Sequence, residues 1–131
     1  MKGFVADIEE LTEENEDFRR VLYSGKHLQL VLMTLKPGEE IGAEVHSGTD
    51  QFFRFEEGKG EVWIDGKRSK VQGDDAVIIP AGAKHNVVNT GDTPLKLYTL
   101  YAPPEHLDGI VRTTRAQAVA SEEHFDGKTT E

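Results

Sequence analysis

The sequence predicts an all-β domain, built as a sandwich or a barrel. Eight or more short runs of β-prone residues follow one another at a spacing of roughly ten residues, with Gly, Pro, Asn and Asp turns between them. The run HLQLVLMTL at 27–35 is apolar on both faces, which is typical of a strand that is covered twice. The chain has 131 residues and no cysteine, which is enough length for one hydrophobic core without disulfide bonds. We therefore expect one domain over residues 1–131.

The predicted elements follow from local patterns, taken in chain order. The acidic stretch 7–17, with apolar residues three apart, favours a short exposed helix. Asp65-Gly66 is a hairpin signal between two strands. The alanine-rich stretch 113–123 predicts a C-terminal helix, and the tail at 125–131 is expected to fray. Strands are expected at 18–24, 27–35, 40–46, 51–57, 61–64, 67–71, 76–79, 85–89 and 95–101.

Charge and hydropathy exclude several classes of protein. The formal net charge of −9 argues against a surface that binds the phosphate backbone of nucleic acids. No apolar run approaches the roughly eighteen residues that a membrane-spanning helix requires, and the acidic N-terminal stretch contains no signal-peptide core. We therefore expect a cytoplasmic protein with no nucleic-acid or membrane partner. The second cover of strand 27–35 comes either from the N-terminal segment or from another subunit, and the latter predicts a homodimer.

Two short runs carry side chains that bind metals. Glu44 and His46 are two apart on a predicted strand, so both side chains point to the same face. Four turn-forming residues follow His46 and allow Gln51 to open the returning strand close by. His85 comes after a Pro-Ala-Gly turn at the entry to another strand. Three or four side chains with metal-ligand chemistry are therefore expected to converge inside a small β-barrel.

The two runs resemble the paired motifs of the cupin family. The first cupin motif is G-x5-H-x-H-x3/4-E-x6-G, and its spacing is kept by Gly38, Glu44, His46, Gln51 and Gly58. Here a glutamate replaces the first motif histidine and a glutamine replaces the motif glutamate. The second motif, G-x5-P-x-G-x2-H-x3-N, is kept with one extra residue by Gly73, Pro80, Gly82, His85 and Asn89. The resemblance implies a double-stranded β-helix, a jelly-roll barrel over about 18–104 with its site inside. The short helical segments expected from local pattern would flank this barrel, with a C-terminal helix and tail at 113–131.

The resemblance also implies that His46 and His85 are metal ligands rather than ordinary strand histidines. Glu44 would then be an inner-face charge that a cation compensates; its alternative is a surface carboxylate opposite a lysine. Two histidines and one carboxylate form the set that non-haem iron oxygenases use, and the set also suits zinc, nickel, manganese or copper. We therefore expect a divalent transition metal of open identity. Gln51 either coordinates it weakly or hydrogen-bonds a bound substrate.

Three functions fit this pattern. The first is a metal-dependent enzyme, an oxygenase or an isomerase, that acts on a small organic molecule inside the barrel. The second is a module that binds a sugar or another small ligand and holds a structural metal. The third is a metal-free barrel that serves in assembly. Small cupins of this kind resemble proteins labelled mannose-6-phosphate isomerase-like, but no arginine at an inward position of the motifs is available to clamp a phosphate. We favour a metal-binding cupin whose reaction and substrate the sequence leaves open; if it is an enzyme, an oxygenase-type reaction is expected. Tyr98 and His106, which flank the Pro103-Pro104 strand stop, are the candidate catalytic groups, and the alternative for His106 is a histidine of a surface loop.

Overall fold

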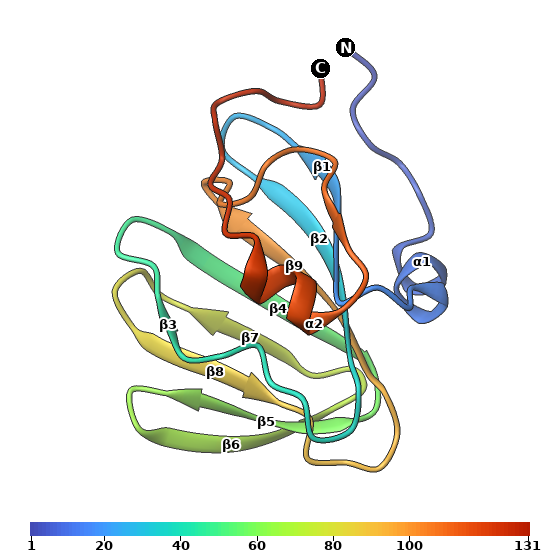
Figure 1. Ribbon diagram of the computed structural model, residues 1–131, viewed down its shortest axis with the longest axis vertical. Helices are drawn as coiled ribbons and strands as arrows, with labels where there is room; N and C mark the ends of the chain where they lie inside the picture. Colours follow the sequence, from blue (N-terminus) through green and yellow to red (C-terminus); the bar gives the residue numbers. More distant parts are fainter.

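The computed structural model describes residues 1–131 and consists of two β-sheets and two short helices (Figure 1). This confirms the predicted all-β class with short helical segments near both ends. Neither helix has the length and the apolar character that crossing a membrane would need. The helices are α1 (Ile8–Glu14) and α2 (Arg115–Ala120). The strands are β1 (Arg19–Ser24), β2 (Gln29–Leu35), β3 (Glu44–Val45), β4 (Asp50–Glu57), β5 (Lys59–Ile64), β6 (Lys67–Gln72), β7 (Ala76–Ile79), β8 (Lys84–Val88), β9 (Leu95–Ala102) and β10 (Val111–Arg112).

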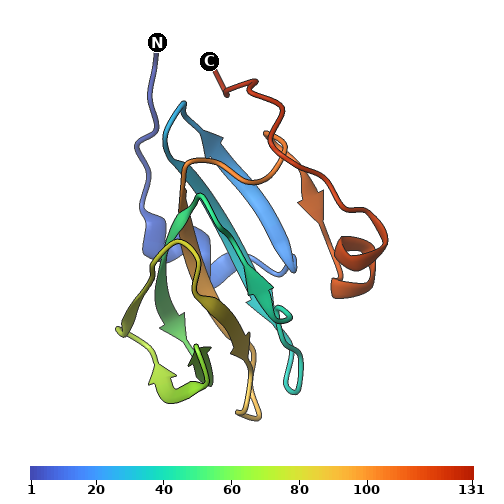
Figure 2. The ribbon, with the colours of Figure 1, turned by 90° about the vertical axis from the view of Figure 1, so that its left-hand side faces the viewer.

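All neighbouring strands pair in antiparallel fashion. One sheet has six strands in the order β10-β1-β2-β9-β4-β7, and the other has four in the order β3-β8-β5-β6. Apart from β1–β2 and β5–β6, neighbours in each sheet come from distant parts of the chain, so the strands pass back and forth between the sheets, as in a double-stranded β-helix. Figure 2 shows α1 and α2 on opposite sides of the strands.

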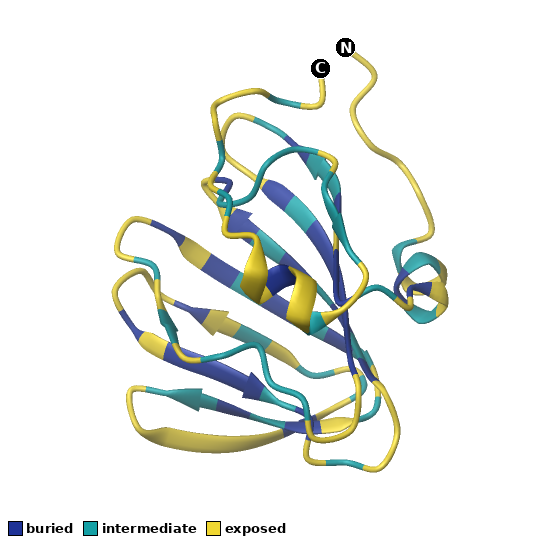
Figure 3. Ribbon diagram, viewed as in Figure 1, coloured by how far each residue is buried: buried dark blue, intermediate teal, exposed yellow.

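The hydrophobic core lies between the two sheets. Along β4 and β9, every second side chain is buried, so one face of each strand lines the core (Figure 3). Phe53 and Phe55 are 1% and 0% exposed and stack with their ring centroids 6.3 Å apart. These two phenylalanines therefore fill the core, where packing is as dense as in an organic crystal.

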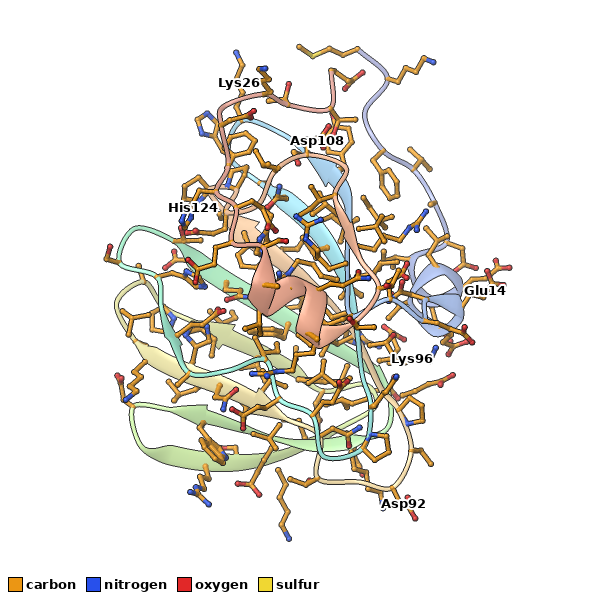
Figure 4. The ribbon with its side chains drawn as sticks, in the orientation of Figure 1. Glu14, Lys26, Asp92, Lys96, Asp108 and His124 are labelled. Carbon is orange, nitrogen blue, oxygen red and sulfur yellow. The ribbon has the colours of Figure 1, made fainter.

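Strand β2 is covered on both faces within this one chain. Val31 and Met33 belong to the core, and Leu32 on the opposite face is only 2% exposed. Helix α1 contacts β2, β4 and β9 on that outer side, and Lys96 of β9 donates a hydrogen bond of 2.6 Å to the carbonyl oxygen of Asn15, just after α1 (Figure 4). The N-terminal segment thus supplies the second cover. The homodimer, which was inferred from this strand, stays a prediction.

Two turns follow from local backbone chemistry. Asp65 and Gly66, between β5 and β6, both have positive φ (47° and 84°), as a type I′ hairpin requires. Gly58, between β4 and β5, has a φ of 91°, and a Cβ there would lie 2.5 Å from the carbonyl oxygen of Pro94. Any other residue at position 58 would push the chain away from the start of β9, so the last glycine of the first motif is required sterically.

The C-terminal segment differs from the expectation in two ways. Only Arg115–Ala120 is helical within the predicted range 113–123, starting after the N-cap Thr114. The tail is not frayed, because Thr130 exchanges hydrogen bonds with Ser24 at the end of β1. The sequence pattern of the tail is polar, and these long-range bonds compensate for its lack of apolar contacts.

Candidate metal centre

Three side chains with metal-ligand chemistry meet inside the barrel. Glu44 on β3 lies directly opposite His85 on β8, and His46 comes directly after the end of β3, on the same side as Glu44. One ligand atom from each of the three residues lies within 4.8 Å of the other two. The convergence expected from the sequence is therefore present, and we call Glu44, His46 and His85 the metal-ligand group.

His46 and Glu44 are already paired with each other. His46 Nε2 lies 3.0 Å from Glu44 Oε2. This hydrogen bond is the largest influence on the pKa of His46 and raises it above the usual 6.5; burial opposes the rise, and the charges of Glu44 and Glu105 add to it. The pair therefore favours a shared proton in the absence of a cation. A bound metal ion would replace that proton, because a histidine ligand must be neutral.

His85 presents a lone pair that has no partner. The residue is 4% exposed, and its Nδ1 lies 3.1 Å from the carbonyl oxygen of Ala83. Because a carbonyl oxygen only accepts, the proton of a neutral His85 belongs on Nδ1, and Nε2 keeps its lone pair. Nε2 is buried without a hydrogen-bond partner. Such an unsatisfied atom costs about 1–3 kcal/mol, and a metal ion bound to it would remove that cost.

Gln51 shows the same pattern on the other sheet. It lies on the inner face of β4 and is 3% exposed. Its amide nitrogen donates to Thr99 Oγ1 at 3.0 Å, whereas its amide oxygen is buried without a partner. The oxygen is thus free to accept from a ligand or to coordinate a cation. Two imidazoles, a carboxylate and an amide oxygen fit a divalent transition metal.

A cavity of about 450 Å³ opens beside the metal-ligand group. Glu44 and His46 form part of its wall, and Arg19 from β1 lines it as well. Another part of the wall comes from α2 and the segment after it, including Val119 and His124 (Figure 4). The C-terminal segment therefore covers the mouth of the barrel. A small molecule in this cavity would lie next to the metal-ligand group.

A buried polar chain extends from His46 toward the C-terminal segment. The Tyr101 ring packs edge-on against the rings of both His46 and His106, and its Oη lies 3.2 Å from His106 Nε2. Burial raises the pKa of Tyr101 well above its usual value, so the hydroxyl keeps its proton. Burial, followed by the positive charge of Arg19, lowers the pKa of His106 to about 3, so His106 is neutral. Its Nδ1 faces the Glu123 carboxylate at 3.7 Å, which favours the proton on that nitrogen and leaves Nε2 to accept from Tyr101.

Tyr98 is not positioned to take part in chemistry at this site, which corrects its choice as a catalytic candidate. Side chains alternate along β9, so Tyr101 is buried inside while Tyr98 lies on the outer face, where its ring centroid is 6.3 Å from that of Phe52. Tyr101, three residues further on, is the tyrosine beside His46. The other candidate, His106, lines the cavity.

Sequence reasoning missed Glu105, Glu123 and Arg19, which all belong to the cavity wall. Glu105 lies 3.7 Å from His46 Nδ1 and accepts a hydrogen bond from Thr49. Glu123 comes from the segment after α2, and Arg19 comes from β1. The only signal available was strand parity, which puts Arg19 on the same face as the apolar residue two positions later. The two glutamates lie outside strands and carry no periodic pattern.

Comparisons place the chain among known proteins. A family model described as "Cupin domain" matches residues 31–101. The uncharacterized protein YrkC of Bacillus subtilis is 48% identical over 128 residues, which cover 93% of this chain and 69% of that protein. The uncharacterized protein L612 of Acanthamoeba polyphaga mimivirus is 37% identical over 123 residues, covering 90% of this chain and 76% of that protein. A crystal structure of a Bacillus halodurans protein, 48% identical, aligns with a TM-score of 0.90 over 92% of this chain and 96% of that one.

Proposed function

We propose that this chain, which belongs to the cupin family, binds a divalent transition metal and acts on a small organic molecule held beside it, in an oxygenase-type reaction. The observation that carries the proposal is the metal-ligand group, whose ligand atoms lie within 4.8 Å of one another. The unpartnered Nε2 of His85 supports it further, because buried polar atoms of purely structural histidines are normally hydrogen-bonded.

The protein's own groups prepare the cavity for a ligand. When bound to two histidines and one carboxylate, a divalent metal supplies Lewis-acid chemistry and, in the case of iron, activation of oxygen. The Tyr101 ring packs against the His46 ring, and its hydroxyl donates its proton to His106 Nε2, which lies 3.2 Å away. The free amide oxygen of Gln51 accepts a hydrogen bond from the ligand or takes a further metal position.

The sugar-phosphate isomerase alternative is less well supported by the cavity. A phosphate dianion is best held by several cationic groups, and Arg19 is the only Lys or Arg in the cavity wall, beside four glutamates. A binding module without turnover is favoured by one observation. Gln51 is a neutral amide where the family motif has a glutamate, and its unpartnered oxygen can accept a hydrogen bond from a bound ligand, while Glu44 keeps the single negative charge of the ligand set.

Oxygen uptake separates an oxygenase from a binding module. The protein is loaded with iron(II) and mixed with small organic molecules that raise its melting temperature. Oxygen consumption together with a changed molecule in the NMR spectrum supports the oxygenase. A molecule that binds and is recovered unchanged, with no oxygen consumed, supports the binding module.

Metal content tests the metal site itself. Wild-type protein is titrated separately with zinc, manganese, iron(II), nickel and copper(II), desalted and analysed by mass spectrometry of the elements. We expect about one equivalent per chain for at least one metal, and a loss of occupancy in His85→Ala. His27→Ala is the matched control, because His27 is exposed before β2. A wild type that retains none of these metals, or equal occupancy in His85→Ala, would refute the proposal.

A further inference from the structure

Arg19 is a buried cation without an anionic partner. The residue is 8% exposed. None of the ion pairs within 4.0 Å includes it, and its Nε is buried with no hydrogen-bond acceptor. Its guanidinium carbon lies 5.6 Å from the centroid of the Phe18 ring, which offers only a weak cation–π contact.

A neighbouring arginine provides the contrast. Arg112 lies beside Arg19 in the register of β1 and β10, and its Nη2 donates to Glu123 Oε2 at 3.2 Å. Removing a charged group from water is costly unless an anion and hydrogen bonds compensate. The Nε of Arg112 also lacks an acceptor, but Arg112 has a carboxylate partner within the chain, and Arg19 has none. A cation that the fold leaves unpaired in a cavity wall is characteristic of a ligand site.

Arg19 acts on the same cavity as the metal-ligand group. It lines the cavity of about 450 Å³ together with Glu44 and His46. After burial, the charge of Arg19 is the next influence on the pKa values of both Tyr101 and His106, and His106 lines the same cavity. The positive charge is therefore directed at the space where a ligand would contact the metal.

We propose that Arg19 binds the carboxylate of a small organic acid whose other end lies beside the metal-ligand group. This inference rests on the proposed function, because it assumes a metal at the metal-ligand group. It adds the chemical class of the ligand, a small carboxylic acid. The planar guanidinium presents two parallel N–H donors that match a carboxylate. A phosphate dianion fits less well, because no second Lys or Arg lines the cavity. Three further negative residues line it instead, namely Glu105, Glu122 and Glu123.

The experiment compares the affinity of defined probes for four forms of the protein. The probes are acetate, succinate and benzoate, with succinamide as the neutral control and inorganic phosphate as the competing anion. Isothermal titration calorimetry is carried out with wild type, Arg19→Met, Arg19→Lys and Arg68→Met, each zinc-loaded and metal-free. Arg68 is the matched control, because it lies on β6 outside the cavity, with its guanidinium 4.2 Å from the centroid of the Trp63 ring.

We expect at least one carboxylate probe to bind the wild type. Binding should be roughly ten- to a hundredfold weaker in Arg19→Met, as for the loss of a hydrogen-bonded charge pair, and unchanged in Arg68→Met. Arg19→Lys should bind with intermediate affinity, because lysine keeps the charge but lacks the two parallel donors. Metal-free Arg19→Met should melt no lower than the wild type, because the change removes an unpaired buried charge.

Four results would overturn the inference: no carboxylate bound by the wild type, equal binding by wild type and Arg19→Met, tighter binding of phosphate than of every carboxylate, or a large loss of stability in both Arg19 variants. Zinc titrations without any acid report separately on the proposed function. Zinc binding without Arg19-dependent acid binding would refute this inference alone. Arg19-dependent acid binding by a protein that takes up no metal would refute the metal site alone.

Discussion

Glu44→Gln is the substitution that tests the metal-ligand group most directly. It keeps the shape of the side chain but removes the negative charge that would face a divalent cation, while His46 and His85 remain. Replacing a residue that only supports a metal ligand weakens binding by about 10–100-fold. A residue that is itself a ligand should matter at least as much. We therefore expect a loss of about a hundredfold or more, which corresponds to about 3 kcal/mol.

This loss converts into a difference in melting temperature. At a free zinc concentration of about a hundred times the wild-type Kd, zinc stabilises the wild type by about 2.7 kcal/mol, and a variant with hundredfold weaker binding by about 0.4 kcal/mol. For a chain of 131 residues, 1 kcal/mol corresponds to about 4 °C. The wild type should therefore gain about 11 °C with zinc, and the variant about 2 °C.

The assay is a zinc titration followed by differential scanning calorimetry at pH 7.5, repeated at lower pH. Because the hydrogen bond to Glu44 raises the pKa of His46, protons compete with zinc in the wild type already above pH 6.5, and this competition should move to lower pH in the variant. Asp92→Asn is the control, an equivalent carboxylate-to-amide change in an exposed loop (Figure 4). The same zinc-dependent gain in Glu44→Gln and wild type would remove Glu44 from the ligand set and refute the reasoning.

Three further predictions concern other parts of the molecule. Gln51→Glu adds a negative oxygen and should raise zinc occupancy above wild type after identical purification; unchanged occupancy would assign Gln51 to ligand binding. Burial holds the pKa of His106 at about 3 in the folded protein, whereas the imidazole of the unfolded chain takes up a proton near pH 6.5. The contribution of neutral His106 to stability is therefore complete above pH 6.5 and is lost as the pH falls toward 3. Between pH 6.5 and 5 the free energy of unfolding, measured with urea, should drop by about 2 kcal/mol more in wild type than in His106→Phe. The raised pKa of His46 acts in the opposite direction, but it does so equally in both proteins. Parallel declines of the two proteins would contradict the prediction. The predicted homodimer would use the apolar row across the outer face of the six-stranded sheet. Light scattering should therefore give twice 14.6 kDa for the wild type and a monomer mass for Ile78→Lys. A monomer mass for the wild type at all concentrations would exclude the homodimer. That row consists of Leu30, Leu100, Phe52 and Ile78.

The positions of the proposed ligands were predictable because they depend on local geometry. Alternation along a strand puts Glu44 and His46 on one face, and both face the interior in the fold. A short turn returns the chain at Gln51, which lies on the inner face of β4. His85 follows its turn and enters β8 opposite Glu44. Each step needs only the parity of a strand and the length of a turn, which are properties of neighbouring residues.

The choice of Tyr98 failed although the necessary signal was present. Leu95 and Leu97 mark the buried parity of β9, and both are fully buried in the structure. The same parity puts Tyr101 inside and Tyr98 outside. Proximity to the proline stop favoured both tyrosines equally, whereas parity distinguishes them.

The covering of the cavity was not predictable from local pattern. Residues after α2 bring Glu123 beside Arg112 and His106, which are distant in the sequence. The segment is polar, and most of it is neither helix nor strand. Its position depends on side-chain hydrogen bonds to a fold that already exists, so no periodicity in the segment itself records it.

The net charge of the chain also says little about the ligand. A charge of −9 disfavours nucleic acids through the long-range field, but exposed charges are screened beyond about 8–10 Å. Within the cavity wall, local pairing decides instead: Glu123 is paired with Arg112, whereas Arg19 has no anion. Strand parity puts Arg19 on the face of the apolar Val21 and Arg20 on the other face, but it does not show that Arg19 lacks an anion. Arg20 pairs with Asp17 at the surface, so an acidic protein can present one buried cation to an anionic ligand.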